Sequence, residues 1–120
     1  MSLAAYKILH LLGLALVMLG LGGACFHALN GGDRESNQKR GLVAALHGTG
    51  LLLLIVAGFG MLAKQKLGMP GWIHPKLLIW LLLGAALPVL NRKPASAMGV
   101  LVALPLFIIA AAYFGIYKGS

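Results

Sequence analysis

The residues of this sequence that could do chemistry are few, because long apolar stretches make up most of it. The candidates in or beside these stretches are His10, His27, His47, His74 and Lys76, with Lys7 at a shallower level. Ionisable groups in a membrane are costly, so each needs a partner or a role. Two histidines at one depth could supply both axial ligands of a haem iron. Alternatively, each His lies near a membrane surface and donates to a backbone carbonyl or to water.

A zinc site is less favoured than haem by the same residues. The sequence has no HExxH or CxxC motif, and no apolar stretch carries a carboxylate. Its two acidic residues, Asp33 and Glu35, lie together in one polar segment, and Cys25 is the only cysteine. Zinc sites need several thiolate, imidazole or carboxylate ligands close together.

Four apolar stretches must position the candidates, at about 3–29, 41–63, 72–90 and 95–117. Hydrophobic residues make up 60% of the 120 residues and charged residues 10%, whereas soluble domains carry about a quarter charged residues. Each stretch is long enough to cross a hydrocarbon core of about 30 Å as a helix, and short connections make neighbouring helices antiparallel. We therefore expect an all-α integral membrane protein, one transmembrane domain over residues 1–120 built as an antiparallel four-helix bundle.

The net charge of +8 arises from ten Lys and Arg residues against two acidic ones. Most of them flank the apolar stretches, as membrane anchors do, so the expected partner is the lipid bilayer and not nucleic acid. Both chain ends and the 64–71 connection share one side, called side A, and the 30–40 and 91–94 connections share the opposite side B. Side B has five Lys or Arg and side A three to five, so the positive-inside rule favours side B as cytoplasmic.

Small residues predict where helices approach closely. Three pairs stand four residues apart: Gly20 and Ala24, Ala44 and Gly48, and Ala111 and Gly115. Gly13, Gly20 and His27 recur every seven residues and therefore share one helix face. Pro88 is expected to end or kink the third helix, and Pro105 to bend the fourth.

Depth in the bilayer sorts the ionisable candidates into two groups. His10 lies two turns into the first helix from side A, where the third helix begins with His74 and Lys76. These three are expected to form one cluster. His27 is close to side B, and His47 about two turns in from that side, so these two are expected to form a pair.

Lys76 can face either of two ways. Trp72, Lys76 and Trp80 stand four residues apart and share a helix face. Trp72 suits the aromatic belt at the membrane surface, and Lys76 could extend to the head groups from one turn inside. Alternatively, its ammonium points inward, towards a haem propionate, a lipid phosphate or an iron.

Short motifs in three of the four stretches resemble a loose superfamily of small membrane proteins, the SirB, HemJ and CopD-like families. The motifs are Tyr6-Lys7-Ile8-Leu9-His10, with a Lys-x-x-His opening, then His47-Gly48-Thr49-Gly50, and Trp72 with Lys76-Leu77. SirB-like proteins are of similar length with four spans. HemJ-type proteins are protoporphyrinogen oxidases that bind haem b, and a His and a Lys are implicated there, whereas CopD-like proteins are linked to copper handling. Residue by residue, the resemblance points to His10, His47 and Lys76.

Two departures separate the sequence from these families. The final segment of HemJ-type proteins carries carboxylates, whereas the 95–117 stretch has none. The His and Met sets of a copper carrier are also missing, because the methionines are scattered as packing residues would be.

The function expected from the residues and the resemblance is that of a haem-b-binding component or an accessory subunit of a membrane redox complex, rather than a stand-alone enzyme. His10 and His47 would ligate the iron, and Lys76, His27 and His74 are further cofactor-binding candidates. Other membrane subunits or further copies of the chain would be its partners, in a bacterial inner membrane. The alternatives are a HemJ-like protoporphyrinogen oxidase and an oligomeric transporter for a small solute or metal.

Overall fold

The computed structural model describes residues 2–66, 71 and 73–117, the last four of these by their backbone alone. These residues form the helices α1 (Leu3–Leu29), α2 (Arg40–Gln65), α3 (Ile73–Arg92) and α4 (Ala97–Tyr117), with a 3₁₀ turn η1 (Pro94–Ser96) before α4. The predicted stretches agree with the helices to within two residues at every end. Trp72, the expected start of the third helix, lies outside the described residues.

All four helices are long enough and apolar enough to cross a membrane. The 27 residues of α1 correspond to roughly 40 Å at 1.5 Å per residue, more than the hydrocarbon core requires. The all-helical architecture is therefore confirmed, and the four apolar helices indicate an integral membrane protein.

Local signals set several helix ends. Ser2 begins α1, its hydroxyl oxygen accepting a hydrogen bond from the backbone N–H three residues further on at 3.1 Å. After α1, Gly31 has a φ of 89°, a left-handed conformation that costs glycine little, and it turns the chain into the connection to α2. Pro88 and Pro105 both lie inside their helices, so neither residue ends its helix.

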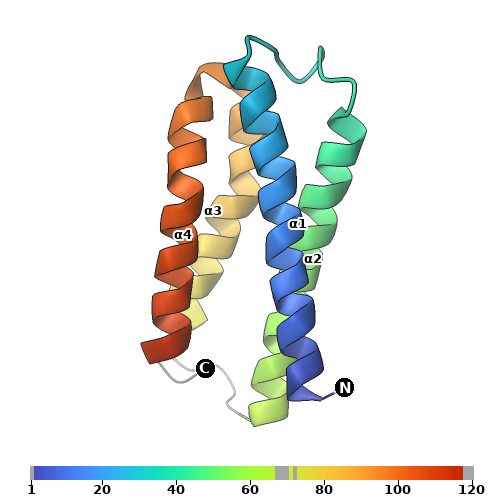
Figure 1. The fold of residues 1–120 in the computed structure, drawn as a ribbon. Helices are drawn as coiled ribbons and strands as arrows, with labels where there is room; N and C mark the ends of the chain where they lie inside the picture. Colours follow the sequence, from blue (N-terminus) through green and yellow to red (C-terminus); the bar gives the residue numbers. More distant parts are fainter. Residues whose placement is uncertain (1, 67–70, 72, 118–120) are drawn as a thin grey trace.

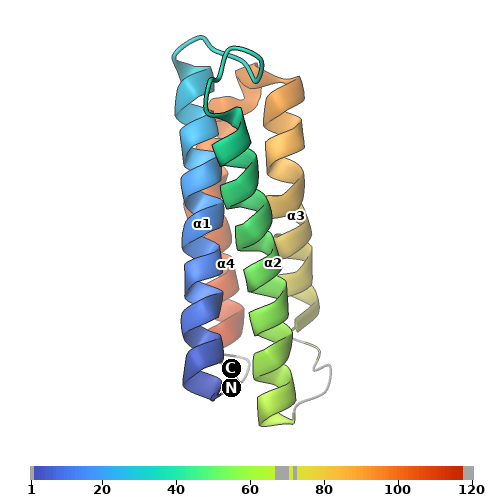
Figure 2. The same ribbon diagram turned by 90° about the vertical axis from the view of Figure 1, so that its right-hand side faces the viewer.

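The helices run alternately up and down (Figures 1 and 2). The start of α1 and the last described turn of α4 lie at the bottom in Figure 1, which is side A, and the 30–39 loop and η1 lie at the top, which is side B. The hydrophobic core fills the half towards side B. It is made of Val17, Leu21, Ala24, Cys25, Leu54, Leu83, Leu87, Leu90, Ala97 and Leu104.

Glycines bring the backbones of α1 and α2 into contact. A Cβ on Gly13 would lie 2.8 Å from the carbonyl oxygen of Gly50, and a Cβ on Gly50 would lie 2.6 Å from that of Gly13. A Cβ on Gly20 would lie 3.0 Å from the carbonyl oxygen of Val43 and 3.1 Å from the backbone nitrogen of His47. A side chain at Gly13 or Gly50 would therefore overlap the facing helix, and one at Gly20 would fit only after a small shift. Gly13 and Gly20, which the sequence placed on one face of α1, both lie against α2.

The other small pairs behave differently. Ala44 and Gly48 are exposed, and a Cβ on Gly48 would meet nothing within 4 Å. The prediction that they form a helix contact is therefore wrong. The residue of α2 that faces α1 is Gly50, which contacts Gly13, whereas Gly48 lies on another face of α2. Ala111 lines a cavity described below, and the surroundings of Gly115 lie outside the described side chains.

Candidate functional site

A cavity of about 400 Å³ occupies the half of the bundle towards side A, where the hydrophobic core ends. All four helices line it, and Leu54 and Leu83 belong to both the core and the cavity wall. Its surface is mostly aliphatic and aromatic. The polar and amphipathic exceptions are Lys7, His10, Gln65, Lys76 and Trp80. Of the predicted site residues, the structure thus brings His10 and Lys76 to one cavity.

His10 is fixed in one orientation by α2. Its Nδ1 lies 3.0 Å from the carbonyl oxygen of Leu54, and because a carbonyl only accepts, Nδ1 must carry the proton and donate. A Cβ on Gly58 would lie 3.5 Å from Cε1 and 3.7 Å from Nδ1 of the ring, so this edge of the imidazole faces α2. In the neutral ring, Nε2 therefore keeps its lone pair and is the nitrogen left to bind a metal or a proton donor.

Trp80 holds α3 against α2 in the same part of the bundle. Its indole N–H donates to the carbonyl oxygen of Leu51 at 3.0 Å. Leu51 lies three residues, about 4.5 Å, from the carbonyl that receives the His10 hydrogen bond. Lys76 lies one turn from Trp80 towards side A, which places it across the cavity at a depth close to that of His10.

His47 is buried, with 6% of its surface exposed, but it is not part of the cavity wall. Its Nε2–H donates to the carbonyl oxygen of Leu83 at 2.9 Å, so its ring joins α2 to α3. The contact between Gly20 and the backbone nitrogen of His47 places His47 at the level of Gly20. That level is ten residues, about 15 Å, from His10 along α1, so these two histidines cannot ligate one iron.

The predicted pairing of His27 with His47 is also wrong. His27 lies seven residues, about 10 Å, beyond Gly20 along α1. Counting turns from the helix ends placed both residues near side B, but it did not include the offset between α1 and α2 that their close contact imposes.

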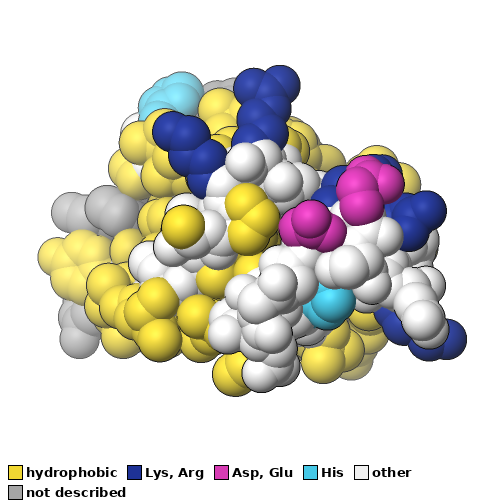
Figure 3. All heavy atoms as spheres, turned by 90° about the horizontal axis from the view of Figure 1, so that it is seen from above, with side chains coloured by type: hydrophobic (Ala, Val, Ile, Leu, Met, Phe, Trp, Pro, Cys, Tyr) yellow, Lys and Arg dark blue, Asp and Glu magenta, His cyan; other side chains and the backbone are white. Residues whose placement is uncertain are grey.

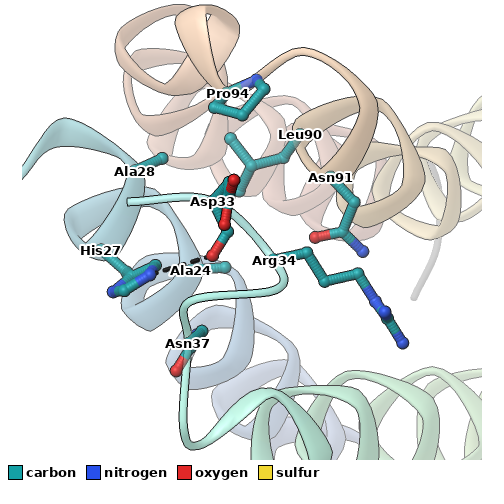
Figure 4. Close-up of a pocket in the computed structure, with 9 residues that line it drawn as sticks. All are labelled: Ala24, His27, Ala28, Asp33, Arg34, Asn37, Leu90, Asn91 and Pro94. Carbon is teal, nitrogen blue, oxygen red and sulfur yellow. Dashed lines mark hydrogen bonds between the residues drawn. The ribbon is translucent and has the colours of Figure 1, made fainter. Parts of the chain in front are cut away.

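His27 instead organises the 30–39 loop at side B. Its Nε2 lies 2.9 Å from the carbonyl oxygen of Asp33, to which it donates, and 2.9 Å from the hydroxyl of Ser36. Figure 4 shows the ring directed at the loop. A Cβ on Gly32 would overlap the imidazole, so the absence of a side chain there leaves room for the ring in this position. The pocket beside this residue has a volume of about 10 Å³, which is room for about one water molecule and not for a cofactor.

The charged side chains at side B form a polar cap over the bundle. Figure 3 shows Lys and Arg side chains around the edge of this face, with the two acidic side chains close to one another. Arg34 pairs with Glu35 at 2.9 Å. Hydrogen bonds from Ser36, first from its backbone N–H at 2.9 Å, hold the pKa of the Asp33 carboxyl below its ordinary value.

His74 does not join the cluster predicted at side A. It is exposed and does not line the cavity. Lys76 lies two residues further on and does line it, because two residues correspond to about 200° of rotation around a helix.

The sequence predicts Lys7 as an ionisable group at a shallower level than the other candidates, and it gives Gln65 and Trp80 no place in the site. Lys7 precedes His10 by three residues and Trp80 follows Lys76 by four, so both spacings place them on the face of a candidate residue. Gln65 carried no such signal. Within the described part of the chain, no group of three or more His, Cys, Asp or Glu residues could hold a metal ion.

Comparison with known proteins gives no relative: no family model, curated protein or solved structure matches this sequence.

Proposed function

We propose that this protein is a haem-b-binding component of a membrane redox complex, with His10 as the iron ligand. The observation that carries the proposal is the hydrogen bond from His10 Nδ1 to the carbonyl oxygen of Leu54. It leaves Nε2 as the available donor atom of the one histidine that, among the described residues, lines the cavity.

The residues beside the cavity fit a haem in three respects. Metal-ligating histidines commonly donate their other ring nitrogen to a backbone carbonyl, which fixes the tautomer and the ring orientation. A volume of about 400 Å³ lies in the range of cofactor pockets, which are mostly apolar with a few polar groups. The walls from α1 to α4 supply that apolar surface. When bound, the iron would supply one-electron transfer, and His10 would orient it.

Fewer histidines are left to ligate the iron than the sequence indicated. His47 serves as a link between α2 and α3, and His27 serves the side B loop. The described cavity wall contains no carboxylate, so the groups there that could transfer a proton are His10, Lys7 and Lys76. In the proposed site His10 would be occupied by the iron and would not be free to act as a base, so electron transfer with other membrane subunits, in a bacterial inner membrane, suits the site better than an independent oxidase.

The orientation that we propose places side B in the cytoplasm. Its loops and the adjoining helix ends carry Arg34, Lys39, Arg40, Arg92 and Lys93, all exposed in the structure. On side A, Lys76 contributes to a cavity wall and not to a loop, which lowers the number of basic residues in the loops of that side.

The test is the optical spectrum of the protein produced with ample haem and purified in mild detergent. A Soret band that shifts on reduction is the expected result. Replacement His10→Gly should remove the band, and added imidazole should restore it, since imidazole can take the place of the missing side chain. His74→Asn is the matched control, because His74 is exposed and outside the cavity, and it should leave the spectrum unchanged. Absence of a Soret band in the wild-type protein would refute the proposal.

A further inference from the structure

The polar side chains of the cavity gather at one of its ends. Lys7 lies one turn from His10 towards side A, and Gln65 is the last residue of α2, which ends at side A. Side chains lean towards the N-terminus of their helix, and for α1 and α3 this direction is side A. Lys7 and Lys76 therefore both lean towards the same end, from helices on opposite sides of the cavity.

The remainder of the cavity wall is apolar. Below His10, towards the core, the cavity is closed by side chains such as Leu14, Leu54, Trp80 and Leu83. The one polar group among these, the indole N–H of Trp80, is already donated to the carbonyl of Leu51. The cavity thus has an apolar floor and a rim with two ammonium groups, which suits a ligand with an apolar body and anionic groups at one edge.

We propose that Lys7 and Lys76 bind the two propionate carboxylates of the tetrapyrrole, and so hold it with its acidic edge at side A and its apolar edge against the core. This inference rests on the proposed function, and it deepens it by naming the ligand class as a tetrapyrrole with free carboxylates. Gln65, at the same rim, offers an amide that can donate to either carboxylate.

The size of the effect follows from the position of the two lysines. Lys7 is exposed and Lys76 is half-buried, so water weakens both ion pairs. A hydrogen bond between charged partners at such a site is worth about a fivefold change in the dissociation constant. Together the two lysines should favour the free acid over a neutral analogue by about 25-fold.

The experiment compares haem b with its dimethyl ester, which keeps the iron and the ring but removes both carboxylate charges. The apoprotein in neutral detergent is titrated with each, and the Soret absorbance gives the dissociation constants. Wild-type protein should prefer free haem by about 25-fold. Lys7→Gln and Lys76→Gln should each lower this preference about fivefold, and the double replacement should abolish it. Lys76→Arg, which keeps the charge, should retain most of the preference. Lys64→Gln is the matched control, because Lys64 is exposed near the same end and does not line the cavity.

The outcomes separate this inference from the proposed function. If haem and its ester bind equally well to the wild-type protein through His10, the lysine assignment is refuted and the haem-binding function stands. If neither binds, the proposed function itself fails. A third arm adds phosphatidylglycerol to the detergent. If it removes the preference for free haem in the wild-type protein, lipid phosphates and not propionates occupy the lysines, and the inference is overturned.

Discussion

The close contact of α1 and α2 makes replacement Gly13→Ala the most direct test of the fold that positions His10. The added Cβ would lie 2.8 Å from the carbonyl oxygen of Gly50, 2.9 Å from Cβ of Leu53 and 2.9 Å from the backbone nitrogen of Leu54. Two of these three atoms are backbone, which no side-chain rotation can move. The helices must therefore separate by about 0.6 Å to restore a contact of 3.4 Å.

A separation of this size loosens the most extensive contact of the bundle. A radial gap of about 0.5–1 Å forfeits a quarter to a half of the dispersion energy of each atom pair that it opens. Inserting a methyl group into a packed interior costs about 1–3 kcal/mol, and alanine's greater helix propensity returns at most about 1 kcal/mol. With the full return, the expected net loss is about 0–2 kcal/mol of unfolding free energy, and about 1–3 kcal/mol relative to a Gly→Ala replacement that meets no neighbour.

The assay is reversible unfolding in mixed micelles, followed by circular dichroism. Gly48→Ala is the matched control on α2, because a Cβ there would meet nothing within 4 Å, and it should be neutral or slightly stabilising. Since the carbonyl that receives the His10 hydrogen bond belongs to Leu54, Gly13→Ala should also weaken the haem binding that we propose. Equal stability of the two variants would refute the packing argument and would return Gly48 to the helix contact that its sequence spacing predicts.

The remaining predictions concern the other polar contacts. Replacement His47→Leu should lower stability by about 1 kcal/mol, the worth of one hydrogen bond, and leave any haem spectrum unchanged; a lost Soret band would make His47 a ligand after all. Gly32→Ala should displace the imidazole of His27, and faster proteolysis of the 30–39 loop would report this. The pKa of Asp33 is lowered by Ser36 in the folded protein, so its contribution to loop stability is present above the ordinary pKa and is lost as pH falls through the folded value. Hydrogen exchange of the loop amides should therefore quicken only in strong acid, and Ser36→Ala should move this change to higher pH.

The helices were predictable from the sequence because long apolar runs are separated by short polar segments. Runs of apolar residues interrupted at Asn30-Gly31-Gly32 and Asn91-Arg92-Lys93-Pro94 give the number and ends of the helices to within two residues. Those runs are apolar on all sides, so they carry no strong periodicity that shows which face of each helix turns inward. Ala44 and Gly48 have the correct spacing for a contact and yet face outward, because Gly13 and Gly50 set the register of α1 against α2.

The candidate site was predictable only in part, for the same reason. Residue counting gives the depth of a side chain along its own helix, and it placed His10 and Lys76 correctly at side A. It gives neither the offset between neighbouring helices nor the direction around the axis. His47 and His27 were therefore paired across a distance of about 10 Å, and His74 was assigned to a cavity that it does not line.

Two backbone carbonyls of α2 hold the polar side chains of the cavity in place, and a sequence gives no sign of which carbonyls these are. The carbonyl of Leu54 receives the N–H of His10 from α1, and the carbonyl of Leu51, three residues away, receives the N–H of Trp80 from α3. Every residue has a carbonyl, so nothing in the residue types marks these two. Both hydrogen bonds end on the same helix, so α2 fixes the depths of His10 and Trp80 relative to one another. Lys76 lies one turn from Trp80, and its depth is therefore fixed as well. Of the histidines in the described part of the chain, His10 alone therefore lines the cavity, held by α2 at the level of a lysine on the opposite wall, whereas the sequence favoured a pair of histidines.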